Sequence, residues 1–179
     1  MKNETSIQLL LRAATFAAEK HKSQLRKNAD ATPYINHPLA VAELLAREGH
    51  VDDPVVLAAA LLHDTIEDTQ TTREDLRERF GEEIASVVQE VTDDKSLPKQ
   101  ERKRLQIEHA PRLSARAKLV KLSDKICNVR DVADDPPKDW ELPRRQEYFD
   151  WAKAVVDGLR GGSAPLEQKF DALFARRPR

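Results

Sequence analysis

The sequence predicts an all-α fold, and three observations support that prediction. Apolar residues recur at spacings of three and four along most of the chain, which is the period of an amphipathic helix. No segment alternates apolar and polar residues between hairpin signals, so strands are not expected. Only five of the 179 residues are glycine, which disfavours a turn-dense β-sandwich or barrel.

The first helix is expected over residues 7–18, where apolar residues follow helical spacing. Thr5 or Ser6 is placed to cap it, because a hydroxyl at that position accepts a hydrogen bond from a free backbone N–H. The next segment, residues 20–36, is polar and basic and has no helical period. It is therefore expected to be a long loop.

Two further helices are expected to begin with proline in their first turn, a position that proline favours. One starts at His37-Pro38 and stops near Gly49, and the other starts at Asp53-Pro54. The run from Val55 to Leu62 in the second of these is apolar on all sides. A helix without a polar face belongs in the interior, so this one should be central and buried.

Shorter helices fill the rest of the chain. Thr72 to Asp75 resembles a capping box with aspartate in the usual glutamate position, and two short helices are expected around Gly81. A polar break covers residues 93–99, ending at Pro98. Later helices are expected over residues 100–109, 113–132, 142–159 and 165–175.

Length and composition predict one globular domain over residues 1–179, with a core over about 5–160 and a C-terminal helix over about 165–175. The net charge of −1 gives no general reason to expect binding to nucleic acid or to an anionic membrane. The single cysteine, Cys127, excludes an intrachain disulfide. With no membrane span and no signal-peptide pattern, we expect a cytoplasmic protein.

Four ionisable residues follow the buried helix within a short stretch. His63 and Asp64 are adjacent at its end, and Glu67 and Asp68 come one turn later, so the spacing of four puts all of them on one rim. Neighbouring buried carboxylates repel each other unless a cation neutralises them, and His with Asp suits Mn²⁺, Fe²⁺ or Zn²⁺. A solvated helix end with incidental charges would explain these four residues equally well.

His37 and Asp124 are candidates to complete a metal site. His37 opens a helix, where a histidine is more often only a cap, and Asp124 interrupts an apolar helix face, where an acid is more often part of an ion pair, here with Lys121 or Arg130. The remaining histidines lie on polar or frayed segments and are expected at the surface: His21, His50 and His109.

The order His37, His63-Asp64, Asp124 matches the pattern of HD-domain metal-dependent phosphohydrolases. Longer blocks resemble the hydrolase domain of RelA/SpoT proteins, in particular the stand-alone small alarmone hydrolases of the metazoan SpoT homolog type. These blocks are QLRK at 24–27, PYINHP at 33–38, HDTIEDT at 63–69, VTDDK at 91–95, ERKR at 101–104, KLSDKICN at 121–128 and QEYFDW at 146–151.

The resemblance implies an HD-domain multi-helix bundle whose buried central helix carries the His-Asp pair. It implies hydrolysis of the 3′-pyrophosphate of ppGpp or pppGpp to GDP or GTP plus pyrophosphate, with one Mn²⁺ as cofactor. The metal ligands would be His37, His63, Asp64 and Asp124. Glu67 and Asp68 would be the catalytic acids, one acting on the nucleophilic water and the other supporting it or the leaving group. No synthetase half is expected.

Because the implied substrate is a polyanion, its site must concentrate positive charge. By resemblance, Arg26 and Lys27 flank the nucleotide, with the Arg26 guanidinium able to stack on a purine. Further candidates for substrate contacts are Lys95, Lys99, Asn128, Arg144 and Tyr148.

Three rival functions stay open on the sequence alone. The first is an enzyme of the same fold that acts on another nucleotide, such as NADPH losing its 2′-phosphate. The second is a nucleotide sensor that has lost catalysis, and the intact candidate metal ligands and acids argue against it, because a sensor need not retain both. The third is nucleic-acid binding through the basic runs at 102–104 and 176–177, which acidic neighbours or a tail position make less favourable.

Overall fold

The computed structural model describes residues 4–28 and 30–179, and it confirms the all-α prediction. Within those residues the only β-type pairing is an isolated antiparallel bridge between Leu25 and Pro33. The helices are α1 (Ser6–Lys20), α2 (Asn36–Arg47), α3 (Pro54–Leu62), α4 (Thr65–Asp68), α5 (Arg73–Phe80), α6 (Glu82–Val91), α7 (Lys99–His109), the 3₁₀ turn η1 (Ala110–Arg112), α8 (Ala115–Asp134), α9 (Leu142–Asp157) and α10 (Ala164–Phe174).

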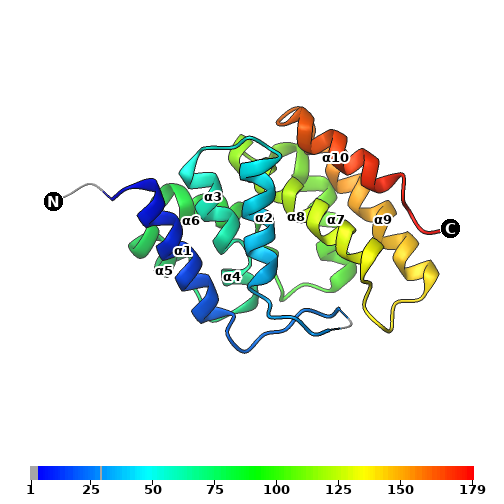
Figure 1. The fold of residues 1–179 in the computed structure, drawn as a ribbon, viewed down its shortest axis with the longest axis horizontal. Coiled ribbons are helices and arrows are strands. Elements are labelled where there is room, and N and C mark those ends of the chain that lie inside the picture. The colour runs from blue at the N-terminus through cyan, green and yellow to red at the C-terminus, as the bar shows by residue number, and fades with distance from the viewer. Residues whose placement is uncertain (1–3, 29) are drawn as a thin grey trace.

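Helix α3 is the centre of the bundle, as its apolar sequence predicts. It packs against α1, α2, α6 and α8, while α9 and α10 pack on α8 at the other end of the molecule (Figure 1). Ala58, Ala59 and Ala60 are fully buried, and so is Leu62 at the end of the helix. These small residues let the neighbouring helices approach α3 closely on all sides.

The predicted caps form. Thr5 accepts from the backbone of Gln8, and Asp53 accepts from the backbone of Val55 ahead of Pro54. Thr72 and Asp75 make the reciprocal pair of a capping box, so aspartate replaces the usual glutamate in that role.

The chain breaks its helix at His63 and Asp64 because side chains take the last carbonyls of α3. The Thr65 hydroxyl donates to the Leu62 carbonyl at 2.7 Å, and His63 Nδ1 lies 2.7 Å from the Ala60 carbonyl. The short helix α4 then restarts, with the Asp68 backbone N–H donating to the Asp64 carbonyl. The break aims His63 and Asp64 inward at the end of the buried helix.

The loop before α2 differs from expectation at one residue. His21 is buried, with 1% of its surface exposed, whereas the sequence predicts a surface histidine; His50 and His109 are exposed as expected. The His21 ring stacks on Tyr34 with centroids 4.9 Å apart, and its Nδ1 lies 2.7 Å from Gln24 Oε1. The prediction is wrong because the loop folds back against α1 and covers this ring.

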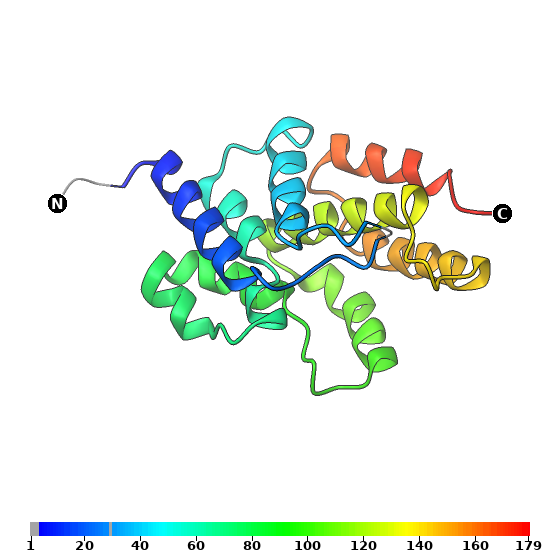
Figure 2. The same ribbon diagram turned by 60° about the horizontal axis from the view of Figure 1, so that its bottom comes forward.

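Helix α7 stands away from the bundle (Figure 2). None of its residues is buried, and its described packing is against α9 and η1. The 3₁₀ turn η1, which follows α7, passes close to the end of α9. A Cβ on Gly158 there would lie 2.9 Å from Ala110 Cβ and 3.0 Å from Pro111 Cδ. Only glycine fits there without displacing η1.

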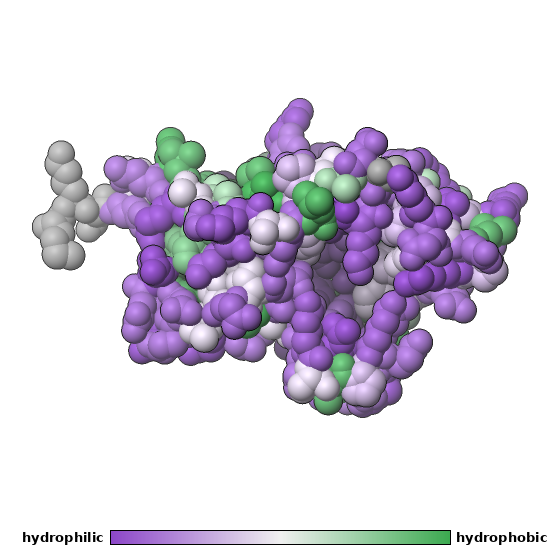
Figure 3. All heavy atoms as spheres, turned by 90° about the horizontal axis from the view of Figure 1, so that it is seen from below, coloured by the Kyte–Doolittle hydropathy of each residue, from purple (hydrophilic) through white to green (hydrophobic). Residues whose placement is uncertain are grey.

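The surface is mostly hydrophilic, and one face is hollowed (Figure 3). The basic runs considered for nucleic acid are largely neutralised. Arg104 pairs with Glu101 and Glu108 at 2.7 and 2.6 Å, and Arg176 and Arg177 pair with Asp134 and Asp150. Among the described residues, no helix is both long enough and apolar enough to cross a membrane.

The buried position of Leu62 predicts a large stability loss on truncation. Leu62→Ala should lower the free energy of unfolding by about 2–5 kcal/mol, because the central helix cannot collapse into the cavity left behind. Urea unfolding followed by circular dichroism measures this. Leu11→Ala, at a side chain 64% exposed on α1, is the control and should change the value by less than about 0.5 kcal/mol. Equal losses in both variants would contradict a central α3.

Candidate metal centre and active site

Four side chains from three parts of the chain meet at the broken end of α3. His37 comes from α2 and Asp124 from α8, and His37 Nε2 lies 3.1 Å from Asp124 Oδ1. His63 Nε2 lies 3.1 Å from Asp64 Oδ2 and 3.7 Å from Asp124 Oδ1. Asp64 Oδ2 is also 3.9 Å from His37 Nε2. The residues that the sequence singles out as ligands therefore converge.

The donor set fits a divalent metal. Ligand atoms of His37, His63 and Asp124 all lie within 4.8 Å of one another, and all three residues are buried. A carbonyl only accepts, so His63 Nδ1 must donate its proton to Ala60. That leaves His63 Nε2, a buried atom with no hydrogen-bond partner among the described residues, directed at the carboxylates. A backbone contact that fixes the other ring nitrogen is the usual support of a metal-bound histidine.

The charge of this centre is balanced by buried groups. Burial alone would raise the pKa of Asp124, but Lys125, with Nζ 3.0 Å from Asp124 Oδ2, and the two histidines hold it well below its usual range. Burial would lower the pKa of His63, yet Asp64 and Asp124 raise it well above its usual value. A cation binding here would have to displace that histidine proton, so metal binding and protonation compete.

Asp64 is oriented by Tyr34. The Tyr34 hydroxyl lies 2.6 Å from Asp64 Oδ2 and 3.1 Å from Asp68 Oδ2, so it donates to the pair of carboxylates. Burial and the charges of both aspartates raise the pKa of Tyr34, which keeps the hydroxyl protonated and able to donate. Asp68 also pairs with Lys95. Asp64 and Asp68 thus lie side by side, as the spacing of four predicts.

Glu67 has a different environment from Asp68. Its Oε2 accepts from the Asp93 backbone N–H at 3.1 Å, and its Oε1 is 3.8 Å from Arg102 and 3.9 Å from Lys95. Burial, together with the nearby charges of Asp93 and Asp64, raises the pKa of Glu67 to about 7. A carboxyl group with a pKa near neutrality can exchange protons at physiological pH.

A small cavity of about 160 Å³ joins these groups. His37, His63, Asp64 and Asp124 line it together with Glu67, Asp68, Asp93, Lys121, Lys125, Arg26, Tyr34 and Asn128. The volume is enough for an ion, a water molecule and a phosphoryl group, but a whole nucleotide needs more room.

Two larger cavities adjoin it. One, of about 490 Å³, is lined by Arg26, Lys27, Asn128 and Tyr148 among others. Arg26 lies 5.6 Å from the Tyr34 ring centroid and donates to Asn128 at 3.1 Å and to Asp131 at 2.7 Å. These bonds hold its guanidinium in place, with Asn128 in turn donating to Asp124. The two cavities share Arg26, Tyr34, Asp68 and Asn128.

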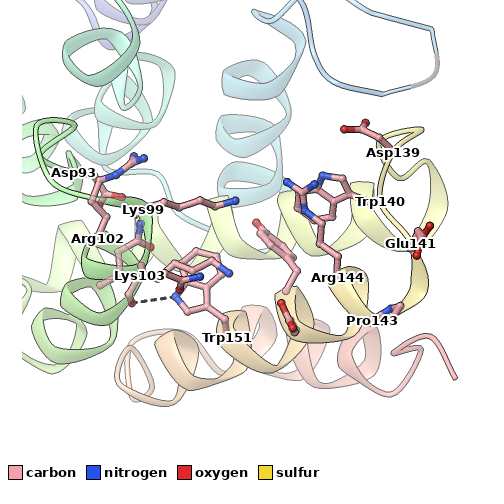
Figure 4. Close-up of a pocket in the computed structure, with 14 residues that line it drawn as sticks. Asp93, Lys99, Arg102, Lys103, Asp139, Trp140, Glu141, Pro143, Arg144 and Trp151 are labelled. Carbon is pink, nitrogen blue, oxygen red and sulfur yellow. Dashed lines mark hydrogen bonds between the residues drawn. The ribbon is translucent and has the colours of Figure 1, made fainter.

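The other, of about 710 Å³, lies between α7 and the start of α9 (Figure 4). Lys99 and Arg144 line it from opposite helices, and Tyr148 and Trp140 separate it from the 490 Å³ cavity by lining both. Among the predicted substrate residues, Lys95 is placed differently from the rest. It lies beside Asp68 and Glu67 as their counter-ion.

Sequence reasoning missed several residues of the centre. Asp124 pairs with Lys125, not with Lys121 or Arg130; Lys121 instead donates to the Val91 carbonyl at 2.9 Å, and Arg130 lies 3.8 Å from Asp131. Tyr34 has no spacing signal in the sequence, because its contact with Asp64 spans 30 residues and depends on the loop conformation.

Comparisons with known proteins agree with this geometry. A family model described as HD domain matches residues 13–148. Guanosine-3′,5′-bis(diphosphate) 3′-pyrophosphohydrolase MESH1 of Xenopus tropicalis is 58% identical over 166 residues, and the human protein of the same name is 54% identical over 168 residues. The alignments cover 93% of both chains for the Xenopus protein and 94% of both for the human one.

A solved structure is similarly close. It is described as a metazoan ortholog of SpoT that hydrolyzes ppGpp and plays a role in starvation responses. It superposes with a TM-score of 0.92 at 50% identity, covering 94% of this chain and 95% of the other.

The position of Tyr34 predicts that its hydroxyl supports metal binding. Tyr34→Phe keeps the ring that stacks on His21 but leaves Asp64 without its donor, so affinity for Mn²⁺ should fall by about 10–100-fold. Isothermal titration with Mn²⁺ measures this, with circular dichroism to check that the helices persist. Unchanged affinity in a folded variant would contradict the role assigned to the hydroxyl.

Proposed function

This chain belongs to the HD domain family, and we propose that it hydrolyses the 3′-pyrophosphate of ppGpp and pppGpp, giving GDP or GTP and pyrophosphate. The observation that carries the proposal is the buried convergence of His37, His63 and Asp124 beside Asp64, with Glu67 and Asp68 on the same small cavity. Close relatives named for this activity support the choice of substrate.

We propose Mn²⁺ as the cofactor, held by His37, His63, Asp64 and Asp124. The ion would lower the pKa of a bound water and offset charge on the attacked phosphoryl group. The Tyr34 hydroxyl orients Asp64, and the Ala60 carbonyl orients His63. Lys125 keeps Asp124 ionised. These contacts fix the orientation of the proposed ligand side chains.

We infer that Glu67 is the general base and Asp68 its support. Glu67 combines a pKa near 7 with a fixed orientation from the Asp93 N–H, so it can take the proton of the attacking water. Asp68 is already engaged by the Tyr34 hydroxyl and by Lys95. The water oxygen bonds to the phosphorus next to the ribose as the bond from that phosphorus to the 3′-oxygen breaks. The proton that Glu67 takes from the water then passes to the 3′-oxygen, which releases GDP or GTP and pyrophosphate.

The rest of the substrate, its base and its uncleaved phosphate chain, would occupy the two larger cavities. Arg26, held against Tyr34 by Asn128 and Asp131, offers a flat cation on which a purine can stack. Lys27 and Asn128 line the same cavity. Lys99, Arg144 and the hydroxyl of Tyr148 remain for the phosphate chain that is not cleaved.

The decisive assay is pyrophosphate release from ppGpp by the purified protein, with Mn²⁺ and with EDTA. We expect Mn²⁺-dependent release, and loss of both release and metal binding in Asp64→Ala, because that change removes a ligand and leaves the helical packing intact. NADPH is assayed alongside. Phosphate release from NADPH without any release from ppGpp would keep the metal centre and reject the alarmone substrate, and near-normal activity of Asp64→Ala would reject the site.

The raised pKa of Glu67 predicts a rising pH profile. A base must be deprotonated to act, and Glu67 ionises as pH rises through about 7, so kcat/KM should rise with pH and level off above it. A bound divalent cation favours the ionised form and moves this limb to lower pH. The groups facing Glu67 are Asp64, Asp68, Asp93, Lys95, Arg102 and Lys121.

In Glu67→Gln this limb should disappear along with most of kcat, by about 10²–10⁴-fold. Asp94→Asn is the control, because that carboxylate contacts Ser96 on an exposed turn. It should leave the profile unchanged. A limb that persists in Glu67→Gln would assign the titration to another group.

A further inference from the structure

The cavity between α7 and α9 has three cations without a partner acid. Lys99, Lys103 and Arg144 line it, and within the described part of the chain none of them lies within 4.0 Å of a carboxylate. Arg102 on the same face of α7 differs, because it approaches Glu67 at 3.8 Å. Basic side chains left unpaired on a concave surface are available to an anionic ligand.

Trp151 contacts Lys103 through both its backbone carbonyl and its ammonium group. The indole Nε1 donates to the Lys103 carbonyl at 3.1 Å, and Lys103 Nζ lies 5.0 Å from the centroid of the same ring (Figure 4). Lys125, which contacts the metal ligand Asp124, lies 4.7 Å from that centroid. The Trp151 ring therefore contacts both lysines, and it holds the Lys103 ammonium on the wall of the 710 Å³ cavity.

The surroundings of Lys103 favour an added negative charge. Lys103 is half-buried, and burial with the charges of Lys99, Arg144 and Lys125 lowers its pKa, while Glu147 acts in the opposite direction. The other acids of the cavity on the α9 side, Asp139 and Glu141, are exposed at the end away from Lys103 (Figure 4). A phosphate group bound at Lys103 would relieve the repulsion among these cations.

We propose that Lys103 determines specificity for the longer uncleaved phosphate chain, by contacting the terminal phosphate of a 5′-triphosphate. This inference rests on the proposed function, since it places the cleaved 3′-group at the metal centre. The 490 Å³ cavity then takes the base, and the 710 Å³ cavity is left for the 5′-chain. Lys99 and Arg144 serve the two phosphates common to both substrates, and Lys103 serves the third.

The test compares Lys103→Met with wild type on pppGpp and ppGpp. Loss of one charge-assisted contact should lower kcat/KM for pppGpp by about tenfold through KM and leave ppGpp within about twofold. Lys103→Arg should restore the preference. Lys153→Met is the matched control on α9, since Lys153 pairs with Asp157 and does not line the cavity.

Binding of GTP and GDP, measured by titration calorimetry, gives a readout that needs no turnover. Wild type should bind GTP more tightly than GDP, and Lys103→Met should remove that difference. If the protein cleaves neither alarmone but the GTP preference disappears in the variant, the proposed function fails and the phosphate contact stands. Equal effects of Lys103→Met on both alarmones, or a GTP preference that survives it, would overturn the proposal.

Discussion

Two carboxylates, Asp64 and Asp124, are held largely out of water at the end of the central helix, and this burial constrains everything around them. Ionised acids in the interior are stable only when opposite charge or hydrogen-bond donors surround them. Lys125, His37 and His63 approach Asp124, and Tyr34 donates to Asp64. The two carboxylates are therefore held in a cluster of opposite charges and hydrogen-bond donors.

The helices were predictable because each uses local information. The spacing of apolar residues, the capping residues and the prolines can each be recognised within a few residues of sequence. The apolar run at 55–62 therefore predicted both α3 and its burial. The adjacency of His63 and Asp64 at a buried helix end also marked the site. The partners of these residues were not predictable in the same way. Tyr34 contacts Asp64 and Trp151 contacts Lys125 only in the folded chain, so these pairs have no local sequence signal. His21 is buried because the loop folds over it.

The cavities show how a nearly neutral chain can serve a polyanion. Five acids line the small cavity with His37 and His63, whereas the large cavity between α7 and α9 holds Lys99, Lys103 and Arg144, which form no ion pair with a described carboxylate. Tyr148 and Trp140 line both the 490 Å³ and the 710 Å³ cavity. Positive charge is thus available locally, although the whole protein carries a net charge of only −1.

The contact of Gly158 with Ala110 and Pro111 gives the far end of α9 an influence on the site. Helix α7 carries three of the cavity's cations but has no buried residue of its own, so its position depends on its contacts with η1 and α9. Any side chain at Gly158 would push on η1. A side chain at residue 158 should consequently shift η1 together with α7, and with them the cations that α7 places in the large cavity, so a position outside that cavity would alter which anions it accepts.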